Sequence, residues 1–246
     1  MTMTAFQRDE LHACVVGKPD HILFATACGP LAFGFPRQAR YVELRSVHVD
    51  PAPEQSRSRE WREQREHVQI EWLSHEVGKF VRLLQLNNGG AYEQLFSRYA
   101  VFETDALGEL REIAQAMVSL QLVSHYRALF RQQLERFRGQ RDKHGRHVLY
   151  LYRMALTGLH LLEQGQIWVD LPELARFHER VTVLQLLAEL DRHANVSAPG
   201  PYLRELEALA EQLERAVNRA RLPEWVPQRD QAEAWLAGVR ACAADV

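Results

Sequence analysis

A glycine-rich turn between two strand-like segments is the feature that most constrains the fold of this chain. HILFATA, at residues 21–27, is a compact apolar run typical of a buried strand, and RYVELRSVHV, at 40–49, alternates apolar and polar residues. The turn CGPLAFGF, at 28–35, joins them. HVQIEWL, at 67–73, again alternates with a period of two. This part of the chain therefore predicts a small β-sheet.

The hydrophobic period then changes to that of a helix. Apolar residues recur at helical spacing over 74–86, where Ser74 is a candidate helix start, and almost continuously from Asp105 onward. We therefore expect an α+β fold, in which a small mixed β-sheet domain at 1–104 precedes an all-helical C-terminal domain at 105–246.

Residues 52–67 are dense in charge and poor in apolar anchors. Such a composition indicates an exposed loop or a solvated helix rather than part of the sheet.

Composition limits the classes of function. Hydrophobic residues make up 46%, charged residues 25%, and the formal net charge is −2, which argues against disorder and against binding nucleic acid through overall charge. The three cysteines are far apart and lack CxxC spacing, which favours a reducing compartment. Arg8, Asp9 and Glu10 do not fit a signal peptide, and no apolar run has the length of a membrane span. We expect a soluble, cytoplasmic protein with no membrane partner.

The segment 127–153 is the one strongly basic stretch of a near-neutral chain. Its cationic and histidine residues are Arg127, Arg131, Arg136, Arg138, Arg141, Lys143, His144, Arg146, His147 and Arg153, with His125 just before them. The stretch can bind a triphosphate or a nucleic-acid backbone, or it can be the solvated side of amphipathic helices. Both interpretations stay open.

Several blocks, in order, resemble the DNA polymerase beta-like superfamily, and most closely the bacterial predicted nucleotidyltransferases. Those proteins carry a stretch like SGAHLYGFPSPDSDYDLRGVHL, which aligns without gaps with CGPLAFGFPRQARYVELRSVHV at 28–49. Residues 74–97 and 149–174 resemble further blocks of the family. The resemblance covers about residues 20–180 and implies the nucleotidyltransferase fold.

The family transfers an NMP group from an NTP with the help of two divalent ions, which are held by a D-x-D pair and a third acidic residue. The resemblance places Tyr41 and Glu43 at the D-x-D positions and Glu71 at the third. It therefore implies Glu43 and Glu71 as catalytic residues and as ligands of Mg²⁺ or Mn²⁺. Tyr41 is a departure, because a phenol is a poor magnesium ligand at neutral pH.

The turn after the first strand also departs from the family. Gly29 and Gly34 are kept, whereas Pro30 offers no N–H to a phosphate, although it suits the first turn of a helix. The positions that the resemblance and the local chemistry suggest for nucleotide binding are Gly29, Gly34, Arg45, His75, Lys79, Arg146 and Arg153.

Three hypotheses follow. The chain is a nucleotidyltransferase with a divergent metal site, which uses an NTP and an RNA, DNA or protein acceptor, or it is a pseudoenzyme that binds nucleotide or nucleic acid without turnover. In the third, the helical part acts on RNA, since Arg141 and His147 match the loose R-x5-H spacing of helical ribonucleases.

The periodic helix at 202–222 can serve a homodimer or pack within the chain.

Overall fold

The computed structural model describes residues 3–18, 21–35, 41–50, 58–140, 144–192 and 201–244. Its chain falls into two compact units, each of which is described by itself. The sheet unit takes residues 2–32, 38–118 and 226–246, and the helical unit takes 33–37 and 119–225.

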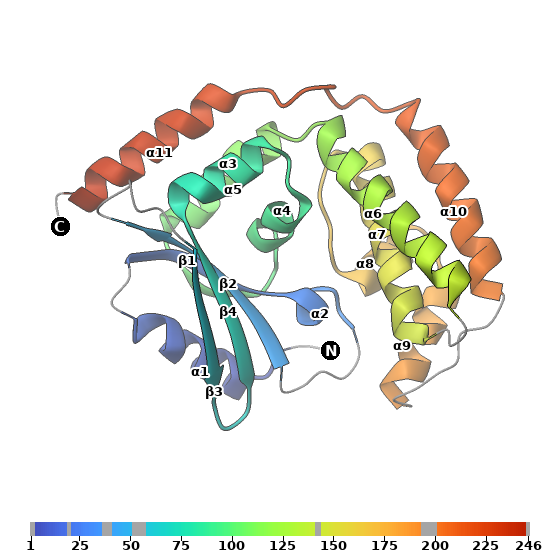
Figure 1. Ribbon diagram of the computed structural model, residues 1–246, viewed down its shortest axis with the longest axis horizontal. Helices are drawn as coiled ribbons and strands as arrows, with labels where there is room; N and C mark the ends of the chain where they lie inside the picture. Colours follow the sequence, from blue (N-terminus) through green and yellow to red (C-terminus); the bar gives the residue numbers. More distant parts are fainter. Residues whose placement is uncertain are drawn as a thin grey trace. The chain divides into compact units, whose positions relative to one another are not determined.

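A five-stranded mixed sheet forms the centre of the sheet unit (Figure 1). Its strands are β1 (His21–Cys28), β2 (Tyr41–Val49), β3 (Arg59–Gln64), β4 (Gln69–Glu76) and β5 (Ala100–Glu103), arranged in the order β3-β4-β2-β1-β5. β2 and β4 are parallel, and the other neighbours are antiparallel. The predicted small mixed sheet is thus confirmed.

Strand β3 contradicts the prediction of a loop or helix over the part of 52–67 that it occupies. Trp61 of β3 lies opposite Trp72 of β4, with ring centroids 4.5 Å apart, and Lys18 Nζ pairs with Glu63 Oε1 at 2.6 Å. An edge strand tolerates charge because one side of it faces water, so charge density alone is misleading here. Residues 51–57 lie outside the described part.

Helices cover both faces of the sheet. α1 (Ala5–Val16) packs on the face that carries Trp72, where Cys14 Sγ of α1 lies 3.4 Å from Glu63 Oε2 of β3. On the other face, Phe80 of α3 (Val77–Gln85) packs edge-on against Phe24 of β1 at 5.7 Å. The remaining helices of this unit are α2 (Gly29–Ala32), α4 (Gly89–Leu95), α5 (Asp105–Ala116) and α11 (Arg229–Ala244).

Helix α3 begins later than the sequence predicts. Strand β4 continues through Ser74 to Glu76, and the Glu76 carboxylate caps α3 by accepting the backbone N–H groups of Gly78 and Lys79. Ser74 is therefore a strand residue and not the helix start.

The helical unit contains α6 (Leu120–Gly139), α7 (Gly145–Gln164), α8 (Leu171–Phe177), α9 (Val181–Arg192) and α10 (Pro201–Val217). α7 is buried along most of its length, and α6, α8, α9 and α10 pack against it. This confirms the predicted all-helical architecture. The apolar face of α10 packs within the chain through Leu206, Leu209 and Leu213, which are buried, and the homodimer stays a prediction.

Two sequence-based expectations stay predictions at this point. α5 and α11 both follow residue 104 and belong by their contacts to the sheet unit, and the division into domains at 1–104 and 105–246 remains untested as a statement about folding. Within the described ranges, no helix combines the length and the apolar character needed to cross a membrane. The cytoplasmic location remains a prediction.

Candidate functional site

Two carboxylates lie side by side on neighbouring strands of the sheet unit. Glu43 of β2 and Glu71 of β4 are direct partners in the parallel ladder, where the strands lie about 4.8 Å apart. Tyr41 precedes Glu43 by two residues and so lies on the same face. The structure therefore brings together the three positions that the resemblance aligned with the metal site of the family.

Tyr41 acts as a hydrogen-bond donor to the neighbouring carboxylate. Its Oη lies 2.6 Å from Glu71 Oε2. Burial, the hydrogen bond to Glu71 and the charge of Glu43 raise the pKa of Tyr41 to about 12, so the phenol keeps its proton at neutral pH. Arg62 Nε lies 3.9 Å from Glu71 Oε1. The Arg62 side chain is 87% exposed, so this ion pair contributes little to stability.

Glu43 is held between a cation and the glycine turn. Arg45 NH2 lies 3.2 Å from Glu43 Oε2. Gly29 has a φ of +62°, and a Cβ built there would lie 2.5 Å from Glu43 Oε1. Gly29 thus lets the carboxylate approach the turn backbone in a conformation that other residues rarely adopt.

Cys28, at the family's serine position, is not a donor to a ligand in this arrangement. Its thiol is buried and bonds within β1, with Sγ 3.8 Å from the carbonyl oxygen of Thr26. Burial raises the pKa of Cys28 to about 12. The thiol therefore stays protonated and unreactive at neutral pH.

His75 and Lys79 lie together but away from the carboxylates. Both contact Ser58 Oγ, His75 through Nδ1 at 2.8 Å and Lys79 through Nζ at 2.7 Å. Burial, followed by the charges of Lys79, Arg45 and His48, lowers the pKa of His75 to about 4, so its ring is neutral. At about 3.3 Å per residue, His75 is about 13 Å along β4 from Glu71.

Gly34, Arg146 and Arg153 belong to the helical unit. Gly34 has a φ of +70°, and a Cβ there would lie 2.7 Å from Pro172 Cδ, so packing against α8 explains this glycine. The guanidinium of Arg153 lies 3.8 Å from the centroid of the Phe33 ring, and its side chain is buried. Arg146 is half-buried in the first turns of α7. Their nucleotide-binding role stays a prediction.

Three arginines of the basic segment are paired with acidic residues inside the helical unit. Arg127 and Arg131 share Glu214 of α10, and Arg138 pairs with Glu207 at 2.7 Å and with Glu135. Arg141 and Lys143 lie outside the described residues, so the R-x5-H hypothesis is untested. The pairs show that α6 uses much of its charge to hold α10.

Sequence reasoning missed two polar clusters of the sheet unit. Glu76 is completely buried, and its Oε1 accepts a hydrogen bond of 2.9 Å from Arg240, whose position on a distant helix has no signal in the sequence. Glu10, Glu66 and His67 bring their ligand atoms within 4.8 Å of one another on the surface. The Glu10 carboxylate there accepts the backbone N–H of His67, which explains the cluster without an ion.

One comparison with known proteins identifies the family of this chain. A search of curated proteins found no match. A crystal structure of a nucleotidyltransferase-like protein from Exiguobacterium sibiricum 255-15 is 17% identical over 86% of this chain and 73% of its own, with a TM-score of 0.36, which is too low to support a conclusion. The family model described as "RNA repair pathway DNA polymerase beta family" matches residues 3–237, nearly the whole chain, and confirms the resemblance to the DNA polymerase beta-like proteins. This chain belongs to that family, RlaP.

Proposed function

We propose that this protein transfers an NMP group from an NTP to an acceptor, with Glu43 and Glu71 as its metal-binding carboxylates. The observation that carries the proposal is the pairing of these two residues on adjacent parallel strands, beside the glycine turn. Membership of a DNA polymerase beta family supports the same chemistry.

The donor set fits one divalent ion. Two carboxylates on adjacent strands, which lie about 4.8 Å apart, offer the hard oxygen ligands that Mg²⁺ and Mn²⁺ prefer, and the phosphates of an NTP offer the rest. Tyr41 is protonated and adds no negative charge. A bound ion would neutralise charge on the triphosphate during transfer.

The chain's own residues bind and position the nucleotide in this proposal. Gly29 lets the turn backbone come close to a phosphate, and Arg45, next to Glu43, supplies a cation. The proposal includes His75, Lys79, Gly34, Arg146 and Arg153 as further contacts of the nucleotide. His75 is about 13 Å along β4 from Glu71, and Gly34 and Arg153 also pack against side chains of their own unit.

RNA is the acceptor class that we propose. The family's description refers to an RNA repair pathway, and this supports RNA over DNA or protein.

A second candidate function is nucleotide binding without turnover. It is favoured by the partners of the two carboxylates, since Glu71 accepts a hydrogen bond from Tyr41 and Glu43 pairs with Arg45. A divalent ion has to compete with both partners, which weakens its binding.

Transfer assays distinguish the two functions. Each NTP, labelled on its α-phosphate, is incubated with Mg²⁺ or Mn²⁺ and with RNA, DNA or protein. We expect label to enter RNA, to be lost in Glu43→Ala/Glu71→Ala, and to persist in Glu60→Ala/Glu112→Ala, which removes two exposed carboxylates of the same unit. Absence of transfer with every nucleotide, ion and acceptor contradicts the proposed transfer activity. Calorimetric binding of NTP in that case establishes the second function.

A further inference from the structure

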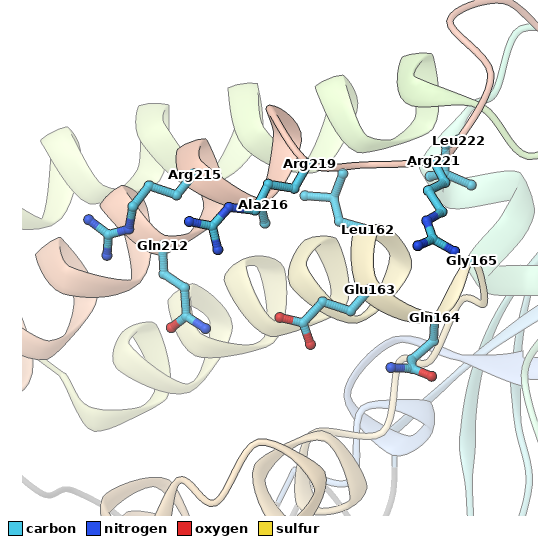
Figure 2. A pocket seen from close by; sticks show the side chains of 10 residues that line it. All are labelled: Leu162, Glu163, Gln164, Gly165, Gln212, Arg215, Ala216, Arg219, Arg221 and Leu222. Atoms are coloured by element: carbon cyan, nitrogen blue, oxygen red, sulfur yellow. The ribbon is translucent and has the colours of Figure 1, made fainter.

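A basic pocket of about 610 Å³ lies in the helical unit, between the end of α7 and the end of α10 (Figure 2). Figure 2 shows Glu163 and Gln164 of α7 on one wall, and Gln212, Arg215, Arg219 and Arg221 on the other. None of the residues proposed for nucleotidyl transfer lines this pocket, and Glu43 and Glu71 belong to the other unit.

Positive charge prevails in the pocket and has little compensation. Arg219 and Arg221 make no ion pair or side-chain hydrogen bond within the described part of the chain. Arg215 has one ion pair there, 3.4 Å from Glu211, and both side chains are more than half exposed, so the pair is weak. Glu163 is the one acidic residue among those that line the pocket.

The contrast with the neighbouring arginines is clear. Arg127, Arg131 and Arg138 of α6 all have carboxylate partners on α10. Glu207 and Glu214 of α10 are therefore used by α6, whereas Arg219 and Arg221, which follow α10, turn their guanidinium groups to the pocket and to solvent.

Local structure explains how these cations are held close together. Arg215 is in the last turn of α10, and Arg219 follows in a turn closed by its own N–H to the carbonyl of Ala216 at 3.0 Å. The carboxyl ends of α7 and α10 carry partial negative charge, which stabilises nearby guanidinium groups. These groups keep N–H donors that a ligand can use. The Gln212 amide is oriented by Arg180, which donates to its oxygen at 2.8 Å.

We propose that this pocket binds the phosphate groups of a single-stranded RNA. Guanidinium groups bind phosphate through paired hydrogen bonds, and several such contacts add up along a polynucleotide. The residues that line the pocket include no aromatic side chain on which a base can stack, so recognition is through the backbone and without sequence preference. That this RNA is the acceptor rests on the proposed function, whereas the binding itself does not.

The test measures fluorescence anisotropy of a labelled oligouridylate of about twelve nucleotides, a length within the range that single-strand binding proteins cover. The protein variants are Arg219→Ala/Arg221→Ala and Arg131→Ala, an exposed arginine of the same unit that serves as the matched control. Two lost phosphate contacts lower the slope of log affinity against log salt concentration by about 1.4. At about 0.1 M salt this corresponds to an affinity loss of about 25-fold. The control is expected to change the affinity by less than about twofold.

Three results would overturn the proposal. They are an unchanged RNA affinity in the double variant, an equal loss in Arg131→Ala, and tight binding at these arginines of inorganic phosphate or ATP but not of RNA. Glu43→Ala/Glu71→Ala is expected to abolish transfer and to leave RNA affinity unchanged, so failure of the pocket and failure of the transfer site are distinguishable. Equal melting temperatures of the variants exclude loss of fold.

Discussion

Gly29→Ala tests whether the glycine turn holds Glu43 in place. The backbone of Gly29 has a φ of +62°, which costs an L-residue about 1–2 kcal/mol. The added Cβ would also lie 2.5 Å from Glu43 Oε1 and 2.6 Å from its Cδ. The carboxylate is the end of a flexible side chain, so it moves away at small cost in stability. It then leaves both Arg45 and its place opposite Glu71.

We therefore expect a modest loss of stability and a large loss of binding. Alanine lowers the entropy of the unfolded chain, which offsets about 0.4–1 kcal/mol of the strain, so the free energy of unfolding falls by about 1 kcal/mol. If Glu43 and Glu71 bind the metal as proposed, displacing one of them weakens Mg·ATP by at least about tenfold, or about 1.4 kcal/mol.

Urea unfolding and calorimetric titration with Mg·ATP measure the two effects. The matched control is Gly108→Ala in α5, where a Cβ meets no atom within 4 Å, and alanine is expected to stabilise the helix by about 0.5–1 kcal/mol. A Gly29→Ala protein with unchanged stability and unchanged nucleotide affinity would refute the reasoning about the turn.

Three further predictions concern the sheet unit. Tyr41→Asp restores a carboxylate and is expected to raise Mn²⁺ affinity about tenfold in calorimetry, with Tyr41→Asn as the uncharged control; equal affinities would contradict this. Because the folded pKa of His75 is lowered to about 4, its contribution to stability is complete above the unfolded value of 6.5 and is lost as the pH falls toward 4. Lys79→Ala should raise the pKa of His75 in an NMR titration, and an unchanged value would be evidence against the coulombic cause. Arg240→Ala leaves the buried Glu76 carboxylate with backbone donors alone and should cost about 1–3 kcal/mol in urea unfolding, whereas a loss below about 0.5 kcal/mol would show that the pair is dispensable.

The predictable elements of the fold are those whose buried positions are apolar. β1 is a compact apolar run, and α5 and the long helices of the helical unit follow the helical period closely. The end of β4 does not, because its buried residues there are polar. Ser74 hydrogen-bonds His48 at 2.7 Å, and Glu76 is satisfied by the N-terminus of α3 and by Arg240. Hydrophobicity cannot identify a strand whose inward side chains are satisfied by distant partners.

The same limit applies to the candidate site. The spacing of two residues on a strand placed Tyr41 and Glu43 on one face, and the resemblance supplied Glu71 on the neighbouring strand. The hydrogen bond from Tyr41 to Glu71 depends on side-chain positions across two strands, which no local pattern contains. Gly34 resembled part of a phosphate turn, but its close neighbour is Pro172, far along the chain.

The place of α11 in the chain has a consequence for synthesis. This helix belongs to the sheet unit, packs on α3 and supplies Arg240 to Glu76, yet the whole stretch 119–225 of the helical unit precedes it. During synthesis the five strands are therefore complete before Arg240 is translated. The Glu76 carboxylate lacks its guanidinium partner until the helical unit has been made. The sheet unit stays incomplete during the translation of about a hundred residues, a delay of about 5–20 s at ordinary elongation rates.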